Sequence, residues 1–595
     1  MLTSIAIRSL GAALGDELRC LLTTLSPSYS LLAWASLVPH AVGALAATRD
    51  VAPTAVPGPE AASAVFEAFV SYSIEFAFFP DFAGNASAPN TFSDNLLANL
   101  GALQGARPYI RVGGNTQDYA LYDESLPYAV NGTYDFSRSR DYPTTVYIGP
   151  SFFESYGTLP GTKFTHGFNL GLGANRSEGW DTLRATVPLA CRAIGADNLD
   201  VWEYGNEPDL YSTSAQGPVR PPSWDEAAYV AQWLDGTREI AARLAAACPD
   251  AFPSPPAFKA PSNGGTANRL RAPAQWAAGL NADRNIRLFS THNYISGAES
   301  PGVTLQGTLM NHTRTVESVR AHAREHADLT ARFGPDAVPP HILGEHNSLY
   351  NQGKPGLSNS FGAALWGVDF NLYAASQGIR RSHMHMGTDY RYQSWQPIET
   401  NMTALGTKAP YYGNIAVAAF LAPPPPPSPQ RSPISVAHIP LDSDPGSPPH
   451  DGRSAAYAAY HGPDLLRILL VDLHAHNSTV NGTGTAPDPD PDRSRATFSH
   501  SFAVPWGADN GGGGGGCCCA LAGVRRLRAN GSDAITGITW DGWSYNHELD
   551  GGRPVRLPNV TVGERVPVDA GRVTLTVSAS EAVIVSAPEG GCRRP

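Results

Sequence analysis

A length of 595 residues exceeds one ordinary domain and suits a large barrel plus a smaller module, and a hydrophobic content of 42% is enough for a real core. The formal net charge is −11 and no dense basic run stands out, which argues against nucleic acid and anionic membranes as partners. We therefore expect a globular protein of two domains with a neutral or modestly charged ligand.

The N-terminal segment has the features of a secretory signal. Its apolar run, 31–47, is interrupted at Pro39 and contains the small residues Ala44-Leu45-Ala46, so we interpret 1–46 as a signal peptide. The run is too short and too interrupted for a transmembrane helix. We expect a secreted, extracellular protein. Nine N-x-Ser/Thr sequons agree with this expectation: Asn85, Asn131, Asn175, Asn311, Asn401, Asn477, Asn481, Asn530 and Asn559.

The cysteines predict disulfides and no metal site. Cys20 would leave with the signal peptide, and the remaining six are Cys191, Cys248, Cys517, Cys518, Cys519 and Cys592. An even number in an oxidising compartment permits disulfides, and their spacing matches no metal-ligand pattern. The three adjacent cysteines follow six glycines, which is typical of a low-complexity loop.

Residues 60–421 predict a (β/α)8 TIM barrel, because eight strand-like runs alternate with helical patterns. The runs are 71–79, 109–112, 163–170, 199–204, 257–260, 286–294, 341–343 and 381–385. Helical spacing of apolar residues is clearest in 225–247 and 360–378. The long connection 116–161 shows little periodicity, and we expect a loop that frames the cleft.

The C-terminal part predicts an all-β sandwich, 456–595, after a Pro-rich linker, 422–455. The linker contains the proline run 423–427, and the sandwich contains β-branched strand-like runs such as 465–473 and 573–585. A strand from the N-terminal segment could complete the sandwich.

Two carboxylates occupy matching positions in the predicted barrel. Glu207 follows the fourth strand, where Gly205 permits an unusual backbone angle and Pro208 helps to end the strand. Glu345 follows the seventh strand in the same way. Taken alone, the sequence Asn206-Glu207-Pro208 is equally compatible with a solvated turn. A second carboxylate at the same end of the barrel instead favours a glycoside hydrolase, with one general acid/base and one nucleophile.

Three motifs carry a resemblance to a known family: RVGGNTQDY (111–119), WEYGNEPDLY (202–211) and LGEHNSLYNQG (343–353). Together they resemble glycoside hydrolase family 79, the β-glucuronidase and heparanase family, over about 71–421, and most of all its fungal secreted members. The resemblance implies a retaining mechanism on a (β/α)8 barrel that carries a β-sandwich. It also implies Glu207 as acid/base, Glu345 as nucleophile and Asn206 as a ligand of the sugar 2-hydroxyl.

Other polar residues lie near the predicted strand ends. Glu75, inside an apolar strand, matches a sugar-contacting acid of the family, and a structural ion pair with Arg111 is the alternative. Asn115 follows two glycines and is either a sugar ligand or a turn residue.

Histidines and tyrosines near the last three predicted strands complete the predicted site. His292 and Tyr294 end the sixth strand, and Tyr294 either orients Glu345, touches a substrate carboxylate or is a rim aromatic. Tyr350 fits a loop around the carboxylate of a uronic acid. His383 and His385 point to one face of the eighth strand, as catalytic or as core histidines.

We therefore expect a secreted, monomeric, retaining exo-β-glucuronidase that hydrolyses terminal β-linked glucuronic acid, or its 4-O-methyl form, from glycans. Its partner is the carbohydrate substrate, with no nucleic acid, no membrane, no metal and no cofactor. An endo-acting heparanase is the alternative within the family, but it would favour a basic cleft. A non-catalytic carbohydrate-binding protein on the same fold is disfavoured because both Glu207 and Glu345 are present.

Overall fold

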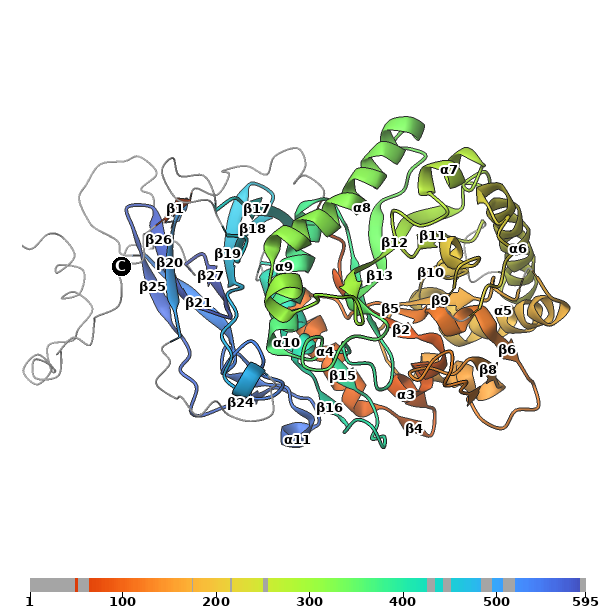
Figure 1. Ribbon diagram of the computed structural model, residues 1–595, viewed down its shortest axis with the longest axis horizontal. Coiled ribbons are helices and arrows are strands. Elements are labelled where there is room, and N and C mark those ends of the chain that lie inside the picture. The colour runs from red at the N-terminus through yellow and green to blue at the C-terminus, as the bar shows by residue number, and fades with distance from the viewer. Residues whose placement is uncertain are drawn as a thin grey trace, which may run out of the picture.

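The computed structural model describes residues 49–51, 64–173, 175–214, 217–249, 255–424, 434–441, 451–482, 495–506 and 520–588. The predicted signal peptide, the three adjacent cysteines and Cys592 lie outside these ranges. Figure 1 shows a barrel with its helices at one end of the molecule and a β-sheet domain at the other, with α9 and α10 between them.

Eight parallel strands close into a barrel in chain order, and the first pairs with the last. They are β2 (Val70–Glu75), β5 (Ile110–Gly113), β9 (Phe164–Phe168), β10 (Leu199–Tyr204), β11 (Phe258–Asn263), β12 (Ile286–Gly297), β13 (His341–Tyr350) and β14 (Ser382–Met386). Each coincides with a run that the sequence predicts, so the barrel is confirmed. Because βα units bring the carboxyl ends of all eight strands to one face, side chains from distant parts of the chain meet there.

Seven α-helices cover the barrel: α4 (Thr91–Gln104), α5 (Ser177–Asn198), α6 (Glu226–Ala247), α7 (Ala272–Ala277), α8 (His312–Phe333), α9 (Phe361–Ser376) and α10 (Ala409–Phe420). The two predicted helices begin at side-chain caps, since Asp225 accepts a hydrogen bond from the Ala228 N–H and Ser360 caps α9. A disulfide joins Cys191 on α5 to Cys248, the residue after α6.

The connection 116–161 is not the loop that the sequence predicts. It contains β6 (Ala120–Tyr122), β7 (Val130–Thr133) and β8 (Thr145–Ile148), which form a small three-stranded sheet. Two 3-10 segments, η3 (Asn115–Tyr119) and η4 (Pro150–Gly157), flank this sheet. Strands of three or four residues are too short to show a period of two, which is why the sequence conceals them.

The C-terminal domain is all β, and its sheet order is β1-β20-β26-β25-β21-β27-β19-β18-β17 with β22, β23 and β24 attached. Its strands are β1 (Arg49–Val51), β17 (Ile434–Ile439), β18 (Ser454–His461), β19 (Asp464–Asp472), β20 (Thr497–Ala503), β21 (Ala520–Arg528), β22 (Thr539–Trp540), β23 (Trp543–Ser544), β24 (Val555–Arg556), β25 (Arg565–Asp569), β26 (Arg572–Ser578) and β27 (Glu581–Ser586). The N-terminal segment does add a strand, because β1 pairs with β20. Strand β17 lies in the range 422–455, so the sheet begins inside the predicted linker.

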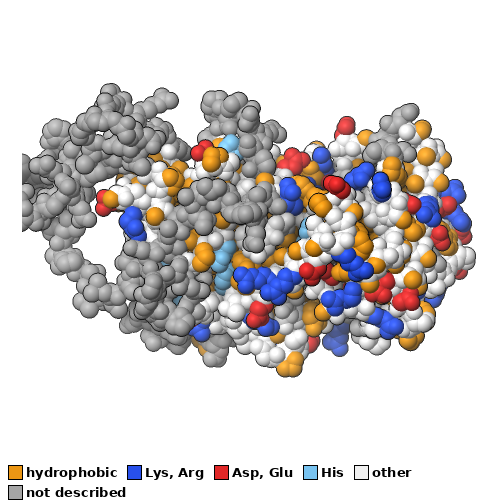
Figure 2. Space-filling view, turned by 90° about the horizontal axis from the view of Figure 1, so that it is seen from above, with side chains coloured by type: hydrophobic (Ala, Val, Ile, Leu, Met, Phe, Trp, Pro, Cys, Tyr) orange, Lys and Arg blue, Asp and Glu red, His pale blue; other side chains and the backbone are white. Residues whose placement is uncertain are grey.

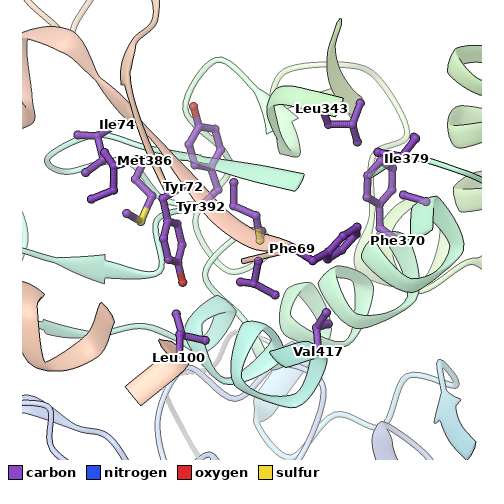
Figure 3. Close-up of a cluster of buried hydrophobic side chains, with 14 of the residues drawn as sticks. Phe69, Tyr72, Ile74, Leu100, Leu343, Phe370, Ile379, Met386, Tyr392 and Val417 are labelled. Carbon is purple, nitrogen blue, oxygen red and sulfur yellow. The ribbon is translucent and has the colours of Figure 1, made fainter. Parts of the chain in front are cut away.

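Successive side chains of strand β19 point to opposite faces of the sheet and belong to two different cores, which joins the two domains. Leu469 and Val471 on β19 belong to the large core that the barrel and its helices share, whereas Ile468 and Leu470 belong to a separate core within the sheet domain. Helix α9 is buried on all sides because it lies between the barrel and β17, β18 and β19. Figure 3 shows the adjoining part of the large core, where side chains of β2, α4, α9 and α10 pack together.

Candidate active site

Both predicted catalytic carboxylates lie at the carboxyl end of the barrel. Glu207 follows β10 and has left-handed backbone angles of φ 51° and ψ 53°, and its N–H donates to the Ser262 carbonyl at 3.0 Å. Glu345 lies inside β13 rather than after a strand that ends at 343, because β13 continues in parallel pairing with the long β12. A β-carbon at Gly205, whose φ is 88°, would lie 2.7 Å from the Leu170 side chain, so this turn requires glycine.

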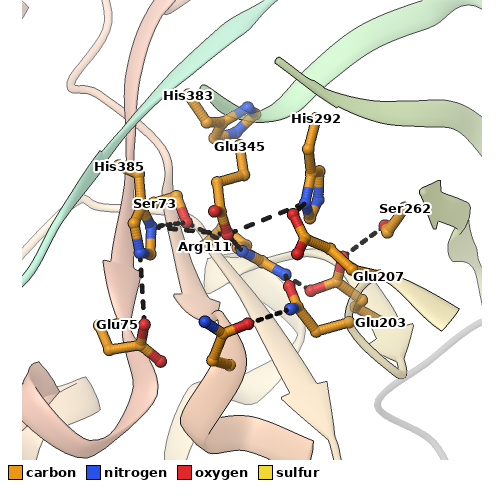
Figure 4. A network of polar contacts seen from close by, with 12 residues as sticks. Ser73, Glu75, Arg111, Glu203, Glu207, Ser262, His292, Glu345, His383 and His385 are labelled. Atoms are coloured by element: carbon orange, nitrogen blue, oxygen red, sulfur yellow. Dashed lines mark hydrogen bonds and ion pairs between the residues drawn. The ribbon is translucent and has the colours of Figure 1, made fainter. Parts of the chain in front are cut away.

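The two carboxylates face each other across His292 (Figure 4). His292 Nδ1 lies 3.0 Å from Glu207 Oε1 and 3.9 Å from Glu345 Oε2. One oxygen atom of each carboxylate and one ring nitrogen of His292 all lie within 4.8 Å of one another. Such a separation leaves a substrate carbon in contact with one carboxylate while the other reaches the leaving oxygen.

Arg111, on β5, joins the site to the barrel interior. Its guanidinium donates to Glu345 Oε2 at 2.6 Å, to Glu203 Oε2 at 2.7 Å and to Ser73 Oγ at 3.0 Å. Its remaining terminal nitrogen donates to Asn206 Oδ1 at 2.7 Å. Arg111 is fully buried, so these four bonds satisfy a charge that has no water around it.

Glu75 has different partners from those predicted. Its carboxylate accepts bonds from the N–H and hydroxyl of Thr116 at 2.8 and 2.6 Å and lies 3.4 Å from His385 Nε2. Neither the ion pairs nor the hydrogen bonds of the described residues join it to Arg111, so the predicted alternative is wrong. His385 Nδ1 lies 3.6 Å from Glu345 Oε2 and therefore belongs to the site. His383 is bonded to the Leu343 carbonyl as a core histidine.

Asn206 is held in a fixed orientation. Its N–H donates to Asp118 Oδ2 at 2.9 Å, and its side-chain amide donates to Asn115 Oδ1 at 3.3 Å while accepting from Arg111. Asn115 therefore lies in the site, as predicted. Asp118, which the sequence analysis did not single out, also accepts the Tyr211 hydroxyl and two N–H groups of the turn after β9.

The two predicted tyrosines lie in different places. The Tyr294 hydroxyl donates to Glu345 Oε1 at 2.7 Å, which supports the role of orienting this carboxylate. Tyr350 is the last residue of β13 and is 48% exposed. Its ring lies against Gly297 and its hydroxyl is 3.4 Å from Ser300 Oγ, at the rim of the barrel.

The surroundings shift the pKa values of the two carboxylates in opposite directions. Burial and the nearby Glu345 charge raise the pKa of Glu207 well above its ordinary value. Burial opposes ionisation of Glu345 as well, but the His385 and Arg111 charges and the Tyr294 bond outweigh it and lower the pKa of Glu345. Burial also lowers the pKa of His292 to about 3, so this ring is neutral at neutral pH. The site therefore combines a protonated Glu207 with an ionised Glu345.

The Glu207, His292 and Glu345 group is also the one set of acidic, histidine or cysteine ligand atoms in the described residues that is close enough to hold a metal ion. However, the Arg111 guanidinium already occupies Glu345 Oε2 and supplies the positive charge there. The arrangement suits acid–base and nucleophilic chemistry on a bound substrate.

Comparison with known proteins agrees with this arrangement. Residues 456–584 match the glycosyl hydrolase family 79 C-terminal beta domain. A β-glucuronidase of Neurospora crassa is 59% identical over 538 residues, which cover 89% of this chain and 92% of the relative. A β-glucuronidase of Aspergillus niger is 52% identical over 530 residues, with the same coverage. Among solved structures, a 4-O-α-L-rhamnosyl-β-D-glucuronidase of Fusarium oxysporum matches 91% of this chain and all of its own, at a TM-score of 0.67 and 25% identity.

None of the helices in the described part of the chain is both long and apolar enough to cross a bilayer.

Arg111 provides a test of this geometry. We expect Arg111→Met to lower the free energy of unfolding by about 3–5 kcal/mol, because it leaves the buried carboxylates of Glu203 and Glu345 without their shared counter-charge. Arg184→Met is the matched control, since Arg184 is 46% exposed and pairs with Glu239 at the surface, and we expect a change of less than about 1 kcal/mol. Denaturant unfolding measures both. Equal effects of the two substitutions would contradict the central position of Arg111.

Proposed function

Because the chain belongs to glycoside hydrolase family 79, we propose that it is a retaining exo-β-glucuronidase, which releases terminal β-linked glucuronic acid from glycans through a covalent glycosyl-enzyme. The observation that carries the proposal is the Glu207–Glu345 pair, in which one oxygen of each carboxylate lies within 4.8 Å of one oxygen of the other. Retaining enzymes need such closeness, whereas an inverting enzyme needs room for a water, with carboxyl groups about 6.5–9.5 Å apart. Because all of these groups come from one chain, we propose that the monomer is active.

In the first step, Glu345 attacks the anomeric carbon and Glu207 donates its proton to the leaving oxygen. The carbon–oxygen bond to the leaving group breaks as the bond to Glu345 forms, so the sugar is held as an ester. Arg111 and the Tyr294 hydroxyl hold the two oxygens of Glu345, which leaves the carboxylate little rotational freedom and aims it at the substrate.

In the second step, Glu207 acts as a base. Ester formation removes the Glu345 charge, which is one of the two leading causes of the raised pKa of Glu207, so the pKa of Glu207 falls when the intermediate forms. The deprotonated Glu207 then accepts a proton from water, and this water attacks the anomeric carbon and frees Glu345. The same electrostatic coupling thus supports both roles of Glu207.

The charge distribution favours this function over an endo-acting heparanase. Figure 2 shows Lys and Arg side chains interspersed with Asp and Glu side chains over the barrel on the face that it presents. A polyanionic chain would favour a continuous basic cleft. The net charge of −11 agrees with a substrate that carries a single charge on its terminal sugar.

We propose secretion as well. The apolar N-terminal run supports it, and so does the disulfide between Cys191 and Cys248, since disulfides persist in oxidising compartments. Of the sequon asparagines whose exposure the structure describes, seven are exposed, where a glycan could be attached: Asn85, Asn131, Asn175, Asn401, Asn477, Asn530 and Asn559. Treatment of the fungal-expressed protein with an endoglycosidase, followed by mass spectrometry, tests this proposal, and unmodified asparagines at all seven positions would contradict it.

Substitution of the two carboxylates tests the mechanism. We expect Glu345→Gln to abolish turnover of every glucuronide, because no nucleophile remains. Glu207→Gln should lower kcat/KM, which reports the first step, by about 10²–10⁴-fold for glucuronides with poor leaving groups but little for those with very good leaving groups, which need no acid. Its kcat should fall for both kinds of substrate, because the second step loses its base. The variant should also lose the decline of kcat/KM at alkaline pH, since this decline reports deprotonation of Glu207. Near-native activity of either variant on a natural glucuronide would contradict the assignment, and so would an α-anomer as the first product in proton NMR.

Two tyrosine variants separate nucleophile orientation from recognition of the uronate. Tyr294→Phe removes the donor to Glu345, so we expect kcat/KM to fall about ten- to a hundredfold for an aryl glucuronide and for the matching glucoside alike. Tyr350→Phe should lower kcat/KM for the glucuronide only, if the rim hydroxyl binds the substrate carboxylate as we propose. An equal loss on both substrates would make Tyr350 a framework residue.

A further inference from the structure

A row of side chains with alternating charge crosses the barrel interior and includes the catalytic carboxylate Glu345. In spatial order the row is Lys259, Glu203, Arg111, Glu345, His385 and Glu75 (Figure 4 shows all except Lys259). The successive nitrogen–oxygen distances are 3.5, 2.7, 2.6, 3.6 and 3.4 Å. The mechanism uses Arg111 and Glu345 but leaves Glu203 and Lys259 without a role.

Glu203 lies too deep to touch a substrate. Its side chain is 1% exposed, whereas those of Glu207 and Glu345 are 15% and 7% exposed. One carboxylate oxygen receives the Arg111 Nε–H, and the other receives the Ser262 hydroxyl at 2.6 Å and faces Lys259 Nζ. Although burial opposes ionisation, Arg111 and Lys259 lower the pKa of Glu203 to about 2, so it is charged at every working pH.

Arg111 therefore has two carboxylate partners, and only one of them reacts. When Glu345 becomes an ester it loses its charge, but the Arg111–Glu203 bond persists on a different nitrogen. The guanidinium can then stay in place and keep its bond to Asn206 through the second step. Lys259 is itself buried on β11, where burial lowers its pKa to about 8. Below that pH it supplies Glu203 with a second counter-charge beside Arg111.

We propose that Glu203 and Lys259 are positioning residues, which hold Arg111 throughout the reaction. Through their own charges, they also set the pH range in which Glu207 works as an acid. This inference rests on the proposed function. Beyond the row, the titratable groups that face Glu203, Lys259 or Glu207 are His166 on β9, Asp200 on β10, Asp209 after β10, Tyr229 on α6, His292 and Tyr294 on β12, and His383 on β14. Burial lowers the pKa values of the three histidines far enough to keep them neutral, so they do not compete with the charges of the row.

The two residues should shift the alkaline decline of kcat/KM in opposite directions. Lys259→Met leaves the Glu203 charge in excess, which makes Glu207 hold its proton more tightly, so the decline moves to higher pH. Glu203→Gln removes a negative charge and moves the decline to lower pH. We expect shifts on the order of half a pH unit or more, from one buried charge acting on another within the same site. The assay uses the full chain and an aryl glucuronide.

Lys163→Met is the matched control, because Lys163 is 43% exposed and lies 4.0 Å from Glu67 away from the row, and it should leave the decline in place. Shifts in the same direction, or no larger than the control, would show that Glu203 and Lys259 are structural only. If Glu203→Gln does not fold, Lys259→Met decides alone, since it retains the Arg111–Glu203 bond. The Glu207→Gln variant distinguishes the two proposals: persistence of the decline in this variant contradicts Glu207 as the acid, whereas its loss there together with unshifted declines in the Lys259 and Glu203 variants contradicts the row alone.

Discussion

A buried guanidinium shared between two carboxylates is the constraint on which the catalytic end of this barrel depends. Arg111 on β5 binds Glu203 on β10 and Glu345 on β13, and each of these charges would be costly to bury without the others. Three strands far apart in the sequence must therefore keep one relative position. Together with the His385 charge, the same contact keeps Glu345 ionised. Burial and the Glu345 charge in turn keep Glu207 protonated, so a structural requirement contributes to the division of catalytic roles.

Much of the fold could be predicted because parallel barrel strands are buried on both faces and appear as continuous apolar runs. The same rule explains the errors. Strand β13 continues beyond 343 through His346 and Asn347, which are buried but polar, so their residue types conceal the strand. The strands between 116 and 161 have three or four residues and lack the length for a periodic pattern. Strand β17 has six residues but lies in the Pro-rich stretch that predicts a linker.

The sequence could predict which residues lie in the site, but not which of them form ion pairs with one another. The residues that the structure brings together as expected are Glu75, Asn115, Asn206, Glu207, His292, Tyr294 and Glu345. The sequence left a Glu75–Arg111 ion pair open as an alternative, yet the partners of Arg111 lie 92 and 234 residues away, and nothing in a single sequence reports contacts across a barrel. A charged residue in an apolar strand, such as Glu203 in DVWEY, is the signal that could have identified the second partner.

The central claim is that Glu345 becomes covalently attached to the sugar, with Glu207 as the proton donor. In a 2-deoxy-2-fluoro-glucuronide, the fluorine slows both steps, whereas a very good leaving group speeds the first step only. The second step is then the slower one, so the intermediate should accumulate. Proteolysis and mass spectrometry of the trapped protein should then locate one fluorinated sugar on Glu345, in the peptide that contains LGEHNSLY. An adduct on Glu207, or rapid release of the leaving group with no adduct on the protein, would contradict the account.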